Sequence, residues 1–222
     1  MTYVMTGLHG DLARYEAMLC EIKFSKKDVL FLLGDVVDYG EESAALLVKI
    51  SMCENVYPIA GEHDYLALRM LTGFERVLAE GGAPDPDFAA EMTAWAMDGG
   101  NATLTGYRAL DKDMREGVLD YLSEFSLYEE LEVKGKNYLL VHAGVNGFTP
   151  DKELDAYEPE DFFEVPEGQK YDTDSIVVVG HAPTASGKIE REGNLVRLGC
   201  GLKESATLAC LCLETGEEFY IG

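Results

Sequence analysis

The chain has 222 residues, of which 47% are hydrophobic and 27% charged, a composition typical of a globular protein with one large or two small domains. Its 41 acidic and 18 basic residues leave a net charge of −23, which repels phosphate backbones and anionic membranes, so neither nucleic acid polymers nor membranes are expected partners. Five cysteines without a Cys-x-x-Cys pair, and no apolar segment of membrane-spanning length, predict a reduced, cytoplasmic protein.

Short apolar runs, each followed within a few residues by glycine and polar groups, predict buried strands at residues 3–5, 29–33, 56–59, 138–141 and 176–179. Apolar side chains at helical spacing predict helices over residues 11–22 and 41–53. The first part of the chain therefore alternates between strands and helices. In an α/β sheet of this kind, ligands bind at the ends of the strands.

Residues 65–128 are mainly helical in pattern, with breaks at 81–86 and 99–101. Because this segment lies between strands that carry polar ends, we expect it to pack on the same sheet, within a single domain spanning residues 1–222. A hairpin turn is predicted at 135–137, and further strands at 195–198 and 206–213. The acidic, proline-containing stretch 146–173 is long for a loop, which predicts a functional or mobile segment.

All four histidines of the chain stand at the ends of hydrophobic runs: His9, His63, His142 and His181. Asp35 and Asp38 follow another such run. A lone histidine at a strand end is usually a packed or hydrogen-bonded residue, but four of them together with aspartates predict one assembled site. Imidazole and carboxylate ligands suit divalent metals such as manganese, iron or zinc.

The segments around these residues have a characteristic order: Gly7-Leu8-His9-Gly10, Gly34-Asp35-Val36-Val37-Asp38-Tyr39-Gly40, Gly61-Glu62-His63-Asp64, Val141-His142-Ala143-Gly144 and Gly180-His181-Ala182-Pro183. They resemble the motifs of calcineurin-like metallophosphoesterases, which are Asp-x-His-Gly, Gly-Asp-x-x-Asp-Arg-Gly, Gly-Asn-His-Glu/Asp, Val-His-Ala-Gly and Gly-His-Thr-Pro. The similarity is greatest to the bacterial phosphoprotein phosphatase and diadenosine tetraphosphate hydrolase branch, and includes the segment 95–107. It implies an αββα sandwich, in which two mixed β-sheets are flanked by helices.

The resemblance also implies a role for each site residue. Asp35 would bridge two divalent metal ions, with His9 on the first ion and with Glu62, His142 and His181 on the second. His63 would act as general acid for the leaving oxygen and Asp38 would orient it. The expected substrate is a phosphorylated one, either a phosphoprotein or a nucleotide-type molecule.

Three substitutions depart from the family pattern. Gly7 stands in place of the first aspartate ligand, and Glu62 replaces an asparagine, so that negative charge has moved toward the second metal. Tyr39 replaces an arginine that grips phosphate oxygens, and no arginine occurs within 146–171 to act as a second clamp. Weaker or altered phosphatase activity is therefore expected.

The leading hypothesis is a metal-dependent phosphoesterase, and the alternative is a non-catalytic relative that binds a metal, a phosphorylated ligand or a protein partner. Several of these residues could also have a purely structural role. Asp38 and Asp64 could be helix caps, Tyr39 a packing residue and Trp95 a core residue.

Overall fold

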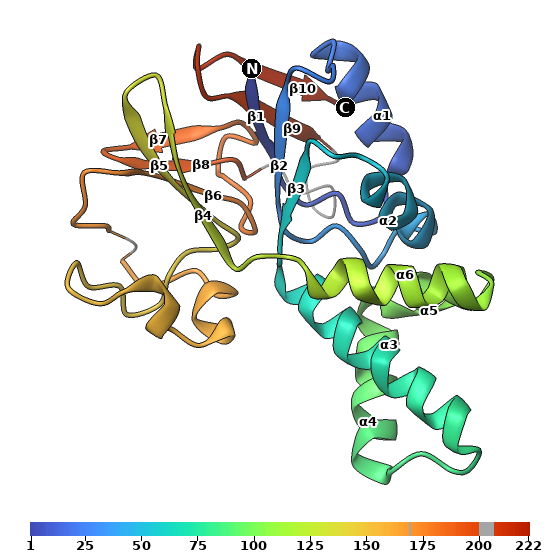
Figure 1. Ribbon diagram of the computed structural model, residues 1–222. Coiled ribbons are helices and arrows are strands. Elements are labelled where there is room, and N and C mark those ends of the chain that lie inside the picture. Colours follow the sequence, from blue (N-terminus) through green and yellow to red (C-terminus); the bar gives the residue numbers. More distant parts are fainter. Residues whose placement is uncertain (169, 200–206) are drawn as a thin grey trace.

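The strands of the protein form two five-stranded sheets, described here from a computed structural model that covers residues 1–168, 170–199 and 207–222 (Figure 1). The first sheet has the order β10-β9-β1-β2-β3, with bounds β1 Thr2–Met5, β2 Val29–Leu33, β3 Val56–Ile59, β9 Leu208–Cys212 and β10 Glu218–Ile221. Strands β1, β2 and β3 are parallel, whereas β9 pairs antiparallel with both β1 and β10.

The second sheet has the order β4-β5-β6-β8-β7, with bounds β4 Tyr128–Val133, β5 Lys136–Val141, β6 Ile176–Val179, β7 Glu190–Glu192 and β8 Leu195–Arg197. Strands β5, β6 and β8 are parallel, and β4 and β7 pair antiparallel at the two edges. Both sheets are therefore mixed.

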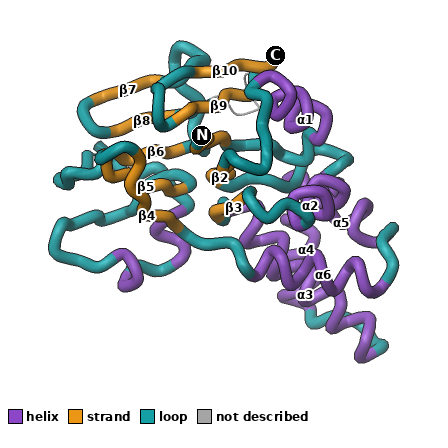
Figure 2. The backbone as a smooth tube through the Cα atoms, turned by 45° about the horizontal axis from the view of Figure 1, so that its top comes forward, coloured by secondary structure: helices purple, strands orange, loops and turns teal. Residues whose placement is uncertain are grey.

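The α-helices gather beside the first sheet (Figure 2). Their bounds are α1 Leu12–Glu21, α2 Ser43–Ser51, α3 Glu62–Glu80, α4 Pro86–Trp95, α5 Asn101–Arg108 and α6 Lys112–Ser123, with a π-helical turn at Ala96–Gly100. Helices α5 and α6 pack against α2, while α3 and α4 extend together away from the sheets (Figure 1). The helical segment thus packs mainly on the helix layer rather than directly on the sheet.

Side chains of each central strand alternate between two cores, because successive residues of a strand point to opposite faces. In β2, Leu30 and Leu32 face the helices, whereas Phe31 and Leu33 enter the core between the sheets. The outer face of the second sheet is covered by the segment after β5, whose 3₁₀ turns Leu154–Ala156 and Pro159–Phe162 place buried Phe162 on the sheet. Burial on both faces explains why these strands read as continuous apolar runs.

The expected architecture of two mixed sheets flanked by helices is confirmed. Two short edge elements, β7 and β10, were not expected, and their residues are at most partly buried. The β4–β5 turn is formed by Lys134 and Gly135, both at positive φ, so the predicted turn at 135–137 is displaced toward the C-terminus. Residue 206 of the last predicted strand lies outside the described residues. Among the described helices, none has the length and apolar character needed to cross a bilayer.

Candidate metal centre

Five side chains reach one place because each follows the carboxyl end of a parallel strand. His9 follows β1, Asp35 follows β2 and His63 follows β3 in the first sheet, while His142 and His181 follow β5 and β6 in the second. The two sheets face each other, so the ends of these strands converge on one rim. The sequence prediction of one assembled site rests on this topology.

The backbone at this rim is strained. Seven described residues other than glycine have positive φ, and five of them belong to the strand-end segments: His9, Asp35, Asp38, Tyr39 and His181. A positive φ is unfavourable for a residue with a Cβ, and such residues cluster where function demands a fixed side-chain direction. The backbone conformation that orients these side chains therefore lowers the stability of the fold.

Two glycines let the converging loops approach closely. A Cβ on Gly34 would lie 2.4 Å from Nδ1 of His142, and one on Gly61 would lie 2.5 Å from the backbone nitrogen of Asp35. Both distances are shorter than any normal contact. Any larger residue at these positions would push the two sheets' site residues apart.

The carboxylate of Asp35 is the centre of the arrangement. Its Oδ2 atom lies 3.8 Å from Nε2 of His9, 3.5 Å from Nε2 of His142 and 3.8 Å from Nδ1 of His181. Two ligand atoms that share a metal ion at bond lengths near 2.1 Å stand about 3–4 Å apart. These separations therefore fit metal coordination without rearrangement.

Backbone carbonyls fix which nitrogen of two histidines faces Asp35. Nδ1 of His142 donates to the carbonyl of Leu33 at 2.8 Å, and Nδ1 of His9 donates to the carbonyl of Val37 at 3.2 Å. Each Nε2 atom is left as a lone-pair donor directed at the centre, which is the usual outer hydrogen bond of a metal-binding histidine. Burial, the largest influence, lowers the pKa of both His9 and His142 and favours this neutral form.

The described residues form two groups of potential ligands that have Asp35 in common. One comprises Asp35, His142 and His181, and the other Asp35, His9 and His63. Burial alone would raise the pKa of Asp35, but the imidazoles of His142 and His181 hold it below its usual value. An ionised carboxylate shared by two sets of imidazoles is suited to bridging two cations.

Glu62 lies outside both groups. It is the first residue of α3 and its side chain is exposed, although it is close enough to contribute to the raised pKa of His181, after the larger effect of the Asp35 hydrogen bond. Its proposed part in metal binding stays a prediction.

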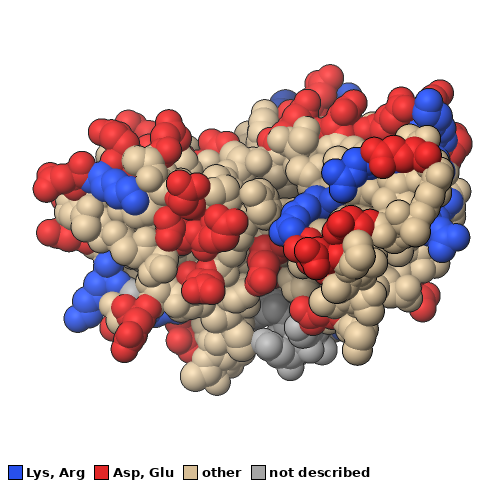
Figure 3. All heavy atoms as spheres, turned by 90° about the horizontal axis from the view of Figure 1, so that it is seen from below, with Lys and Arg blue, Asp and Glu red and all other residues tan. Residues whose placement is uncertain are grey.

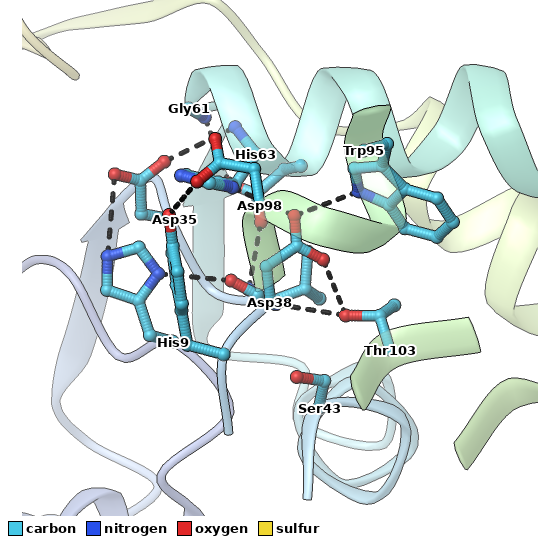
Figure 4. A network of polar contacts seen from close by, with 12 residues as sticks. His9, Asp35, Asp38, Ser43, Gly61, His63, Trp95, Asp98 and Thr103 are labelled. Carbon is cyan, nitrogen blue, oxygen red and sulfur yellow. Dashed lines mark hydrogen bonds and ion pairs between the residues drawn. The ribbon is translucent and has the colours of Figure 1, made fainter. Parts of the chain in front are cut away.

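Next to the centre, His63 and Asp38 form a hydrogen-bonded pair (Figure 4). Nδ1 of His63 donates to Oδ2 of Asp38 at 2.8 Å. Burial favours loss of the His63 proton, but this bond and the nearby Asp35 charge raise the pKa of His63 to about 9. The pair thus holds a proton beside the shared carboxylate.

Asp38 is fully buried and is itself held by two donors from the helical segment. The Trp95 indole nitrogen donates to Oδ2 at 3.0 Å, and the Thr103 hydroxyl donates to Oδ1 at 2.6 Å. Helix α2 is capped at Glu42, so Asp38 is not its cap. Trp95 is a core residue, as predicted, but its hydrogen bond to Asp38 was not foreseen.

Replacing Thr103 with valine should destabilise the fold without displacing metal. The change removes the donor to Oδ1 of Asp38 and the acceptor of the Asp38 backbone N–H at 3.0 Å. We expect the free energy of unfolding in urea to fall by about 1–3 kcal/mol, because buried polar groups lose their partners. Thr93→Val, on the exposed helix surface, is the matched control, and an equal loss in both variants would contradict this account.

Asp64 has the structural role expected of a cap. Its Oδ2 accepts the Gly61 N–H at 2.9 Å at the start of α3, and its Oδ1 accepts the N–H groups of Val36 and Val37. The carboxylate thereby ties the loop after β2 to the loop after β3.

A family model for calcineurin-like phosphoesterases matches residues 2–210 of the chain. The chain belongs to the calcineurin-like phosphoesterase family. This confirms the family resemblance and the expected assignment to a class of phosphoester hydrolases. The two ligand groups that share Asp35 agree with the divalent-metal chemistry of this class.

Curated relatives of the chain include two proteins named symmetrical bis(5′-nucleosyl)-tetraphosphatase. The protein from Acidovorax sp. (strain JS42) is 29% identical over 145 residues, which cover 64% of this chain and 43% of the relative. The protein from Haemophilus ducreyi is 36% identical over 78 residues, covering 34% of this chain and 29% of the relative. The matched segments thus span less than half the length of these relatives.

Solved structures agree with the fold. A crystal structure described as that of a candidate diadenosine tetraphosphatase has a TM-score of 0.68 at 18% identity, covering 99% of this chain and 92% of the other. A protein serine/threonine phosphatase from Saccharomyces cerevisiae has a TM-score of 0.59 at 12% identity, covering 99% and 78%. At these identities the likeness concerns the fold alone.

Tyr39, at the position of the family's arginine, lies directly beside the site. Its ring is 5.2 Å from the rings of both His9 and His63, edge to face, and its hydroxyl donates to Oδ1 of Asp98 at 2.6 Å. The phenol therefore faces an acidic partner. Unlike an arginine that grips phosphate, the side chain at this position is uncharged and its hydroxyl is bonded to a carboxylate.

Acidic side chains are more numerous than basic ones on the surface. Figure 3 shows Asp and Glu spread over much of one face, with Lys and Arg in fewer places. Of the lysines near the motifs in sequence, Lys152 lies over the ring of Tyr157 at 3.5 Å, and Lys170 and Lys188 are exposed. Without bound cations, this charge would oppose the approach of a phosphate.

Proposed function

We propose that the protein hydrolyses phosphoesters at a divalent-metal centre built around Asp35. The observation that carries the proposal is the pair of ligand groups with this carboxylate in common. It is supported by the 3.5–3.8 Å separations between Asp35 and three imidazole nitrogens. Membership of the calcineurin-like phosphoesterases supports the same chemistry.

In this proposal His9 and Asp35 hold one ion, and Asp35, Glu62, His142 and His181 hold the other. Manganese, iron and zinc all suit such ligands, with one or two ions bound. When bound, divalent ions lower the pKa of an attacking water and neutralise the phosphoryl oxygens.

In this proposal the protein itself contributes a general acid, the protonated imidazole of His63. His63 keeps a proton on the ring because Asp38 accepts a hydrogen bond from Nδ1, and Nε2 would donate its proton to the leaving oxygen. Trp95 and Thr103 orient Asp38, and Asp38 in turn orients the imidazole. Tyr39, whose ring lies 5.2 Å from that of His63, contacts the substrate in this proposal.

The substrate proposed is a phosphorylated molecule, of the phosphoprotein or the nucleotide type. The names of the curated relatives favour the nucleotide type. The net charge of −23 favours a substrate with few negative charges beyond the reacting phosphate.

Purified without chelator, the protein should contain about one tightly held divalent ion per chain and should hydrolyse p-nitrophenyl phosphate when manganese is added. One ion is expected because Gly7 lacks a carboxylate, which leaves the His9 side with fewer ligands than the His142–His181 side. Elemental analysis and a chromogenic assay measure the two quantities. Absence of both metal and turnover would refute the proposal.

The alternative is a non-catalytic protein that binds metal, a phosphorylated ligand or a protein partner. Gly7 and Tyr39 are the observations that favour it, because they remove a ligand and a phosphate clamp. It predicts phosphate binding without turnover across manganese, iron and zinc. Installing Gly7→Asp together with Tyr39→Arg should then create activity in the scaffold.

A further inference from the structure

A hollow of about 490 Å³ opens beside His9 and Tyr39. Its lining also includes Asp11, Arg14, Glu41 and Glu42. The hollow begins where β1 ends and continues along the start of α1, so it adjoins the metal centre directly. A substrate whose phosphoryl group sits at the centre has this hollow next to it.

Arg14 is the one basic residue in the lining of this hollow. It stands in the first turn of α1, where Asp11 caps the helix by accepting the Arg14 backbone N–H at 2.9 Å. Asp11 also accepts a hydrogen bond from Nη1 of Arg14 at 3.2 Å. The guanidinium is thereby held on one side, with its side chain 29% exposed.

Within the described part of the chain, Asp11 is the hydrogen-bond partner found for this guanidinium. A guanidinium carries five N–H groups. Only a hydrogen bond from Nη1 to Asp11 is found among the described residues. The planar fork can therefore keep Asp11 as its anchor and offer a second edge to another oxyanion. Phosphate oxygens match that edge in geometry and charge.

A phosphoryl group at this centre needs such a partner. Tyr39 commits its hydroxyl to Asp98, and Lys152 lies over Tyr157 in the segment after β5. The carboxylates of Glu41 and Glu42 in the same lining are exposed, so water and salt screen their repulsion. Arg14, by contrast, lines the same hollow as His9, a proposed metal ligand.

We propose that Arg14 binds a phosphoryl oxygen of the substrate in the hollow beside His9. The proposal rests on the proposed phosphoesterase function. In it, Arg14 supplies the guanidinium that Tyr39 cannot supply at the position of the family's phosphate-gripping arginine. Arg14 and Tyr39 line the same hollow from different elements, so a guanidinium on either one can reach a ligand there. Asp11 acts as a positioning residue for Arg14.

The test is the affinity of Arg14→Met for inorganic phosphate, measured by calorimetry on manganese-loaded protein. Methionine keeps the apolar stem and removes the charge. We expect phosphate to bind about 10- to 100-fold more weakly, the range for losing a charged hydrogen bond, and KM for p-nitrophenyl phosphate to rise in parallel. Metal content should not change. Arg76→Met, on α3 and away from the hollow, is the control for losing one positive charge.

A second variant separates phosphate binding from a structural role of the Arg14–Asp11 pair. In the Arg14→Met background, Tyr39→Arg should restore phosphate affinity to within about 5-fold of the wild-type protein, because it returns a guanidinium to the same hollow. A merely structural role predicts no rescue. Unchanged affinity in Arg14→Met, failed rescue, or no phosphate binding by the wild-type protein would overturn the proposal.

The phosphate readout also distinguishes this inference from the proposed function. If the wild-type protein binds phosphate through Arg14 but hydrolyses no ester, the catalytic proposal fails and the Arg14 assignment holds. If the protein hydrolyses esters and Arg14→Met leaves both phosphate affinity and KM unchanged, the catalytic proposal holds and the Arg14 assignment fails.

Discussion

Asp35→Asn should remove both metal retention and turnover. Oδ2 of Asp35 is within 3.8 Å of three imidazole nitrogens, and the side chain belongs to both ligand groups. An amide of the same shape has no negative charge to hold two cations together. We expect the metal content to fall to about one tenth of the wild-type value and turnover to fall by about 10³-fold or more.

Asp64→Asn is the matched control for this experiment. Asp64 is also buried and lies next to the same loops, but its carboxylate binds backbone N–H groups and belongs to neither ligand group. We expect this variant to keep its metal while losing about 1–3 kcal/mol of unfolding free energy, since the amide has one acceptor oxygen where the carboxylate has two and turns its NH₂ group toward a backbone donor of Gly61 or Val36. If both variants retain metal equally, Asp35 is not the bridging ligand.

The strand ends could be predicted from sequence because burial on both faces leaves a clear apolar signal. The runs at β2 and β6, for example, are each followed by one glycine and then by Asp35 or His181. By contrast, β7 reads Glu-Arg-Glu and shows no such signal, whereas β10 does contain the apolar run Phe219-Tyr220-Ile221, which the sequence prediction did not use. Their strand character depends on pairing with β8 and β9.

The site was predicted less completely than the fold. His63 lies against Asp38, and His9, His142 and His181 lie around Asp35, but Glu62 lies outside both ligand groups and His63 lies inside one of them. The anchoring of Asp38 by Trp95 and Thr103 spans 57 and 65 residues of sequence, and only tertiary packing brings these groups together. For Arg14, the one available signal was its position five residues after His9, in the first turn of the predicted helix.

His63→Ala should slow hydrolysis most for esters with poor leaving groups. An alkoxide leaves with difficulty unless it is protonated, whereas p-nitrophenolate leaves readily without help. We therefore expect turnover of an alkyl phosphate to fall by about 10²- to 10⁴-fold, and turnover of p-nitrophenyl phosphate to fall far less. Steady-state rates on the two esters, with the same metal loading, give the comparison.

The metal content of the same variant decides between two roles for His63. The imidazole lies in the ligand group with His9 and Asp35, so its position also permits direct coordination. A general acid leaves metal content unchanged when it is removed, whereas a ligand takes its ion with it. Asp38→Asn provides an independent check, because the neutral amide is a weaker acceptor for Nδ1 of His63, although it also alters the bonds that Trp95 and Thr103 make to this side chain. A general acid held by Asp38 predicts that this variant repeats the leaving-group dependence with a smaller loss. Equal slowing on both esters, or loss of metal from His63→Ala, would contradict the general-acid role.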